Sequence, residues 1–216
     1  MGQMVSSAIE SVQNDSEKQQ LANDALNQMQ ELGHQQISSF MHDVTNNAVN
    51  AKLIPVGQIL HQESIVRCSI STEAAHIDKE IADTFNLFVK GDMAGAISSI
   101  VRSGLAAVIG SYEGNRSDRT TYAVTTGVLG GIQRVDIRMF AWRYTSTQLT
   151  AITKDMLAVA VIVSAVDPKQ VTNFAIRSMV QEQFDKLPIA EQEKVLKTIL
   201  DAKRKHMMQV NSFNTY

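Results

Sequence analysis

Two runs of sequence decide the fold: Ile132-Gln-Arg-Val-Asp-Ile-Arg-Met-Phe-Ala-Trp-Arg-Tyr144 and Met156-Leu-Ala-Val-Ala-Val-Ile-Val-Ser-Ala-Val166. The first alternates apolar and polar residues, which is typical of a strand that buries one face. The second is apolar on both faces from Leu157 onward, so we expect a central strand that helices cover on both sides. Both runs belong to a β region over residues 120–166, in which Gly130-Gly131 fits a tight hairpin turn between the first two strands.

The N-terminal side of this region reads as helical. Residues 3 to about 50 carry apolar side chains at three- and four-residue steps, and Asn14-Asp15-Ser16 and Gly33 are expected to divide them into two or three helices. We expect these helices to pack on the sheet or on a partner, with a coiled-coil oligomerisation arm as the alternative. Further along, residues 65–70 alternate like a short edge strand, and helices are expected over residues 71–91 and 93–109.

The C-terminal side also reads as helical. Asp167-Pro168 is expected to start one helix, with the aspartate as N-cap, and Leu187-Pro188 is expected to start another. The last helix is expected to end at Lys203-Arg-Lys-His206, where the helix dipole favours cations. Residues 207–216 are expected to fray.

These patterns predict a single α+β domain over residues 1–216. The segments are helical from 3 to 110, with the short strand at 65–70, β from 120 to 166, and helical from 168 to 206. The expected architecture is an antiparallel sheet of three to five strands between N-terminal and C-terminal helical layers.

Composition narrows the classes of function. The net charge of −2 argues against a dedicated nucleic-acid binder, which would need a basic field. Cys68 is the single cysteine, so no disulfide forms within the chain, and no apolar signal segment follows Met1. We therefore expect a cytoplasmic protein, with membrane association as an alternative.

The expected helix 93–109 is almost uncharged and has small residues four apart, which lets helix backbones approach closely. The ordinary interpretation is a buried core helix. The alternative is a segment that leaves the core for a membrane or for another copy. Its contact residues would be Ile97, Ile100, Val101, Gly104 and Val108.

The alternating strand predicts a polar row. One face would hold Val135, Ile137, Met139 and Ala141, and the other Arg134, Asp136, Arg138, Phe140, Trp142 and Tyr144. Asp136 would lie between two guanidinium groups, with Trp142 and Tyr144 beside them. Such a row can hold an anionic headgroup, a phosphate or a carboxylate. The alternative is a salt-bridged ladder covered by the polar side of a helix.

Other signals of chemistry are weak. No histidine has a second ligand at a recognised spacing, and no cofactor is expected. The chain has no Gly-x-Ser-x-Gly elbow, and Cys68 reads as an ordinary buried cysteine. Gly2 fits the permissive pattern for N-myristoylation.

The favoured function is a non-catalytic protein that self-associates or associates with membranes, with a pore-forming type included, in which helices shield an apolar sheet. One alternative is a soluble structural or interaction subunit of an oligomer. The other is an enzyme or small-ligand carrier whose site combines Arg134, Asp136, Arg138, Glu113 and Tyr144. The expected partners are a second copy, another protein or membrane lipid.

Overall fold

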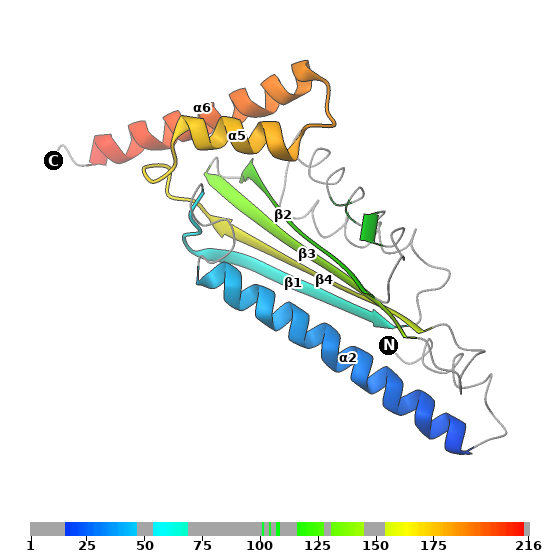
Figure 1. The fold of residues 1–216 in the computed structure, drawn as a ribbon. Coiled ribbons are helices and arrows are strands. Elements are labelled where there is room, and N and C mark those ends of the chain that lie inside the picture. The colour runs from blue at the N-terminus through cyan, green and yellow to red at the C-terminus, as the bar shows by residue number, and fades with distance from the viewer. Residues whose placement is uncertain are drawn as a thin grey trace.

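The structure is a computed structural model that describes residues 16–46, 54–68, 101, 104, 107–108, 116–127, 131–144 and 154–213. Within these residues, helices lie on both sides of a four-stranded antiparallel sheet with the order β1-β4-β3-β2 (Figure 1). The strands are β1 (Ile59–Cys68), β2 (Arg116–Thr126), β3 (Ile132–Tyr144) and β4 (Lys154–Ala165). The helices are α2 (Ser16–Thr45), α5 (Asn173–Gln183) and α6 (Ile189–Phe213). The predicted α+β class is confirmed.

Strand β4 is central, as its sequence predicts. It pairs with β1 on one side and with β3 on the other. Its side chains from Met156 to Ser164 are all buried. Val159 and Val161 belong to one apolar cluster, whereas Ala160 and Ile162 belong to another. The sheet therefore has a buried layer on each face.

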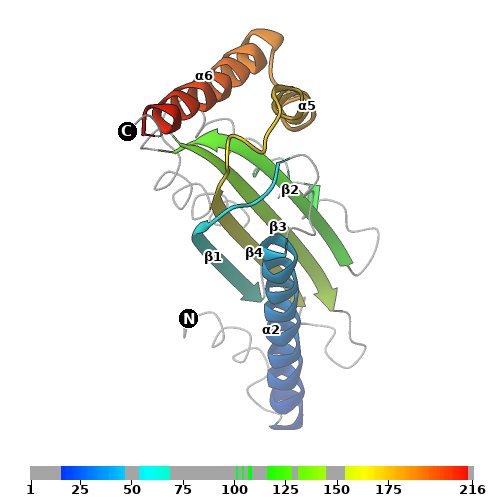
Figure 2. The same ribbon diagram turned by 90° about the vertical axis from the view of Figure 1, so that its left-hand side faces the viewer.

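Helix α2 covers one face of the sheet, which we call the α2 face (Figure 2). Met29, Ile37, Phe40 and Val44 are the buried apolar residues by which the helix joins this layer. Their spacing places them on one side of a helix. They cluster with strand residues that share the same face: Phe140, Met156, Ala158, Ala160 and Ile162.

Gly33 lies inside α2, so the expectation of a break there is wrong. A Cβ atom on Gly33 would lie 2.7 Å from Val66 Cγ1 and 2.8 Å from Met156 Sδ. The absence of a side chain at Gly33 therefore leaves room for Val66 and Met156 where the helix packs on the sheet. Its low helix propensity, about 1 kcal/mol worse than that of alanine, is offset by the packing of the helix on either side of it.

The opposite face of the sheet carries Val135, Ile137, Met139 and Ala141 of β3, as the alternation predicts. The helical residues Val101 and Val108 join this cluster. Gly104 lies against β3, because a Cβ atom there would be 2.8 Å from Met139 Cε. Apart from these positions and Ala107, the predicted helices 71–91 and 93–109 lie outside the described residues. None of the helices that the structure describes is both long enough and apolar enough to cross a membrane.

Helices α5 and α6 lie side by side at one end of the sheet (Figure 1). The prediction that α5 starts at Asp167-Pro168 is wrong, because Thr172 is the N-cap and its hydroxyl accepts a 3.0 Å hydrogen bond from the Ala175 N–H. Asp167 instead closes a turn, in which its Oδ1 accepts from the Lys169 N–H at 2.9 Å. Aspartate and proline suit such a turn as well as they suit a helix start.

Helix α6 begins directly after Pro188, close to the predicted start, but it does not end at His206. It continues to Phe213, so residues 207–213 are helical and not frayed. The cations at 203–206 therefore lie within the helix, and the last turn holds no basic residue. Stabilisation of a helix end by these cations is thus excluded, because that effect falls off within the last turn.

Two predicted β features also have different bounds. The short strand expected at residues 65–70 is β1, which begins at Ile59 and ends at Cys68, and it is an edge strand as expected. The hairpin between β2 and β3 closes with a 2.8 Å hydrogen bond from the Gly127 N–H to the Gly131 carbonyl. Gly131 therefore pairs across the hairpin, and Gly130 lies outside the described residues.

The close approach at Gly33 can be tested by adding one methyl group. We expect Gly33→Ala to lower the free energy of unfolding by about 1–3 kcal/mol, which is typical of overpacking. In a Val66→Ala background the same change should cost less than half as much, since Val66 Cγ1 is gone and the Met156 side chain can turn away. Urea unfolding of the four proteins measures both effects. An equal loss in the two backgrounds would contradict a direct contact.

Candidate functional site

The predicted polar row lies on β3, on the α2 face of the sheet. The β2–β3 register places Tyr122 opposite Asp136 and Thr120 opposite Arg138. Cross-strand neighbours on one face have side chains close enough to interact. The row is therefore flanked by polar side chains of β2 and lies on the face where α2 packs.

Arg134 and Asp136 form an ion pair whose side chains are both 0% exposed. Arg134 Nη2 donates to Asp136 Oδ1 at 2.6 Å, and its Nε donates to both carboxylate oxygens at 3.0 Å. Arg134 Nη1 donates to the Ile54 carbonyl at 2.6 Å. The guanidinium also lies over the Tyr122 ring, 4.5 Å from its centroid. The pair thus joins β3 to the segment that precedes β1, and Tyr122 of β2 packs against it.

Burial dominates the electrostatics of this pair. It raises the pKa of the Asp136 carboxyl above its ordinary value of 3.8, and the charge and hydrogen bonds of Arg134 oppose this shift without cancelling it. Burial likewise raises the pKa of the Tyr122 hydroxyl, and the negative charge of Glu182 on α5 adds to that shift. The Tyr122 hydroxyl is buried and has no hydrogen-bond partner among the described residues.

Arg138 has a different set of partners. Its Nη2 lies 3.0 Å from Asp118 Oδ2 and donates to Gln36 Oε1 at 3.2 Å. Its Nη1 donates to the Thr120 hydroxyl at 2.7 Å. The expected arrangement, with Asp136 shared by two guanidinium groups, is therefore replaced by two separate pairs, Arg134–Asp136 and Arg138–Asp118. Gln36 comes from α2, so a polar side chain of this helix contacts the row at Arg138.

The aromatic end of the row packs into the apolar layer. Trp142 is partly buried against the cluster that contains Phe140 and α2. Arg116 lies over the Phe140 ring at 5.2 Å from its centroid. The side chain of Tyr144 lies outside the described residues. The sequence did not indicate five residues that contact the row, because their roles depend on the register and on long-range packing: Gln36, Ile54, Asp118, Thr120 and Tyr122.

Three of the other predicted site residues are described, and they lie on the opposite face of the sheet from this row. Val101, Gly104 and Val108 lie in the core of the opposite face. Gly2, Ile97, Ile100 and Glu113 lie outside the described residues. Within the described part of the chain, no three His, Cys, Asp or Glu side chains gather as metal ligands would.

No protein-family model matches this chain, and no curated protein sequence matches it.

The chemistry of the polar row follows from its geometry. Nε, Nη1 and Nη2 of Arg134 all donate to protein acceptors, so the pair acts as an internal anchor between strands. Binding of an anion by this row stays a prediction, and Arg138, which is partly exposed, is its most accessible cation.

The coupling of the buried pair can be measured with a double-mutant cycle. Arg134→Met or Asp136→Leu alone leaves one buried charge without its partner, so each should lower the free energy of unfolding by about 3–5 kcal/mol. The double substitution removes both charges and should cost less than either single substitution. Urea denaturation followed by circular dichroism measures all four proteins. Additive losses would show that the two side chains are not coupled.

The pH dependence of stability gives a second test. Because the folded-state pKa of Asp136 is raised, its contribution is fully present below the unfolded-state value near 3.8 and is lost as pH rises through the folded-state pKa. Asp136→Asn removes this titration. We expect the free energy of unfolding of the wild type, minus that of the variant, to fall as pH rises from 3.8. Urea unfolding at a series of pH values measures the difference, and a rise with pH would mean that Arg134 outweighs burial.

Proposed function

We propose that this chain is a non-catalytic, self-associating protein whose copies join edge to edge through β1. The supporting observation is that β1 is paired on one side only and that its side chains are incompletely buried. Within the described part of the chain, β1 pairs with β4 alone. No side chain from Ile59 to Val66 is fully buried, and Leu60 is 48% exposed. A ten-residue edge of this kind is a ready template for another strand.

The other edge of the sheet is β2, and unlike β1 it is protected against pairing with another strand. The first half of β2 exposes the charged residues Arg116, Asp118 and Arg119. Its second half is covered by the C-terminal helices, and Thr121 donates a 2.6 Å hydrogen bond to Gln183 of α5. Charged side chains and a covering helix are the devices by which proteins prevent edge pairing. By contrast, Glu63 is the only formally charged residue from Ile59 to Val66 of β1. Its Oε2 atom lies 3.5 Å from His61 Nε2.

A second copy fits β1 in an antiparallel pair centred on Gln62. Around this centre, His61 of each copy lies opposite Glu63 of the other, and Leu60 lies opposite Ser64. The imidazole of His61 can donate a hydrogen bond to the facing Glu63 carboxylate, and no like charges face each other. The contact is isologous and closes as a dimer with twofold symmetry. Val101, Gly104 and Val108 are buried, so the proposal does not use helix 93–109 as the contact.

Solution mass and site-directed crosslinking test the proposal. Light scattering should give twice the chain mass for the wild type, and Leu60→Lys should shift the protein to the monomer mass because it places two charges at the joint. In a Cys68→Ser background, Gln62→Cys should form an intermolecular disulfide on oxidation, because cross-strand neighbours lie within disulfide range.

Ser64→Cys is the matched control, because it is an exposed polar residue of the same strand. Its symmetry mate would lie about four residues away along the strand, which is roughly 13 Å and beyond disulfide range. A wild-type protein that stays monomeric at high micromolar concentration would contradict the proposal. Crosslinking of Ser64→Cys in place of Gln62→Cys would retain the dimer and contradict the register.

A further inference from the structure

The cations near the C-terminal end of α6 have no structural role as helix caps. Helix α6 continues past them to Phe213, and its last turn is not basic. Lys203 has a structural contact of another kind, with residues at the start of α5. Its Nζ donates to the Val171 carbonyl at 2.6 Å and lies 2.9 Å from Asn173 Oδ1, which fixes the start of α5 against α6. Arg204 is different, because its side chain is 71% exposed and its ion pair with Asp201 is long, at 3.9 Å.

Positive charge is concentrated in residues 194–206 of α6. Residues 194–206 contain Lys194, Lys197, Lys203, Arg204 and Lys205 against the single carboxylate of Asp201, in a chain whose net charge is −2. Arg204 lies seven residues after Lys197, so both project from the same outward side of the helix. That side is opposite the buried residues Val195, Ile199 and Ala202. Glu193 and Asp201 flank Lys197 on this side of the helix, whereas residues 203–206 carry three cations and no carboxylate. The basic part of α6 is therefore its stretch from Lys203 to Lys205, although the chain as a whole is slightly acidic.

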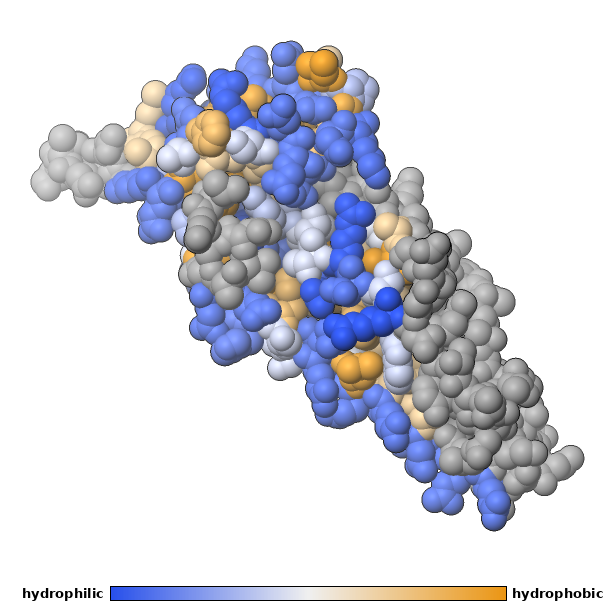
Figure 3. Space-filling view, viewed as in Figure 1, coloured by the Kyte–Doolittle hydropathy of each residue, from blue (hydrophilic) through white to orange (hydrophobic). Residues whose placement is uncertain are grey.

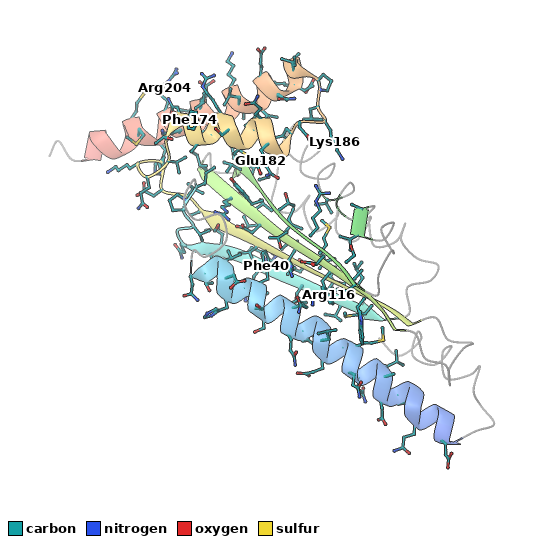
Figure 4. The ribbon with its side chains drawn as sticks, viewed as in Figure 1. Phe40, Arg116, Phe174, Glu182, Lys186 and Arg204 are labelled. Carbon is teal, nitrogen blue, oxygen red and sulfur yellow. The ribbon has the colours of Figure 1, made fainter. Side chains whose placement is uncertain are left out.

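Exposed apolar side chains lie beside these cations. Phe174 is 75% exposed and Met208 is 64% exposed. Met208 follows Arg204 by four residues, which places both on one side of α6. Phe174 follows Asn173, to which Lys203 is bound, so it lies at the same end of the helix pair as Arg204 (Figure 4). Figure 3 shows isolated apolar groups among the hydrophilic side chains that cover α5 and α6.

We infer that this α5–α6 surface, defined by Phe174, Lys197, Arg204, Lys205 and Met208, docks onto a bilayer that contains anionic lipids. Exposed Lys and Arg side chains are attracted to anionic headgroups, and large apolar side chains between them enter the boundary between headgroups and acyl chains. A nucleic acid would use the cations but would leave Met208 without a partner, so the combination favours lipid. This inference is independent of the proposed dimer, which uses β1.

Vesicle sedimentation of the full-length protein tests the inference. We expect binding to vesicles of phosphatidylcholine with phosphatidylserine, weak binding to phosphatidylcholine alone, and loss of binding as salt screens the charges. The double variant Arg204→Gln/Lys205→Gln should lower the partition coefficient about fivefold for each charge removed. Phe174→Ser/Met208→Ser should lower it as well, with the charge unchanged.

The matched control is Arg116→Gln/Arg119→Gln. It removes the same charge from exposed positions of β2, and Arg116 lies at the end of the sheet far from α5 and α6 (Figure 4). This control should bind vesicles like the wild type, and thermal unfolding verifies that every variant is folded. Absence of binding to anionic vesicles at low salt would overturn the inference, as would an equal loss in the control. Unchanged binding by Phe174→Ser/Met208→Ser would show a general polyanion surface and overturn the assignment to a bilayer.

Discussion

The structure depends on the burial of β4 on both faces. A strand from Met156 to Ser164 without an exposed side chain can exist only if strands flank it and separate layers cover its two sides. β1 and β3 supply the flanking strands, and α2 supplies one layer. The opposite layer includes Val101 and Val108 together with the apolar sides of α5 and α6. At roughly 25 cal/mol per Å² of apolar surface, this two-sided burial is the dominant driving force for the fold.

The sequence predicts the class, the central strand and the alternation of β3 because these follow from local periodicity. It fails where tertiary contacts override local preference. Gly33 breaks a helix by propensity, yet α2 continues through it because the helix is packed against Val66 and Met156. Asp167-Pro168 has the chemistry of a helix start, but the chain turns there and starts α5 at Thr172. At Gly33 the deciding contacts are with residues distant in sequence. At Asp167 a turn competes with the helix start for the same side chain.

The candidate site shows the same limit at the level of side chains. Alternation along β3 places Arg134, Asp136 and Arg138 on one face without any knowledge of the fold. It does not reveal which carboxylate each arginine takes, because Asp118 reaches Arg138 only through the β2–β3 register. The alternation also does not reveal that Arg134 and Asp136 are fully buried, because this depends on long-range neighbours such as Ile54 and Tyr122.

The buried pair also has a consequence for the edge strand. Replacement of such a pair by apolar residues is often neutral or stabilising in other proteins, so our hypothesis is that this pair provides specificity more than stability. Here the specific element is the bond from Arg134 to the Ile54 carbonyl, which fixes the chain shortly before β1 begins at Ile59. Because side-chain burial along β1 is incomplete, this anchor and the ladder to β4 together set the position of the strand. The buried Arg134–Asp136 pair is thereby linked to the chain that leads into the edge that we propose to join two copies.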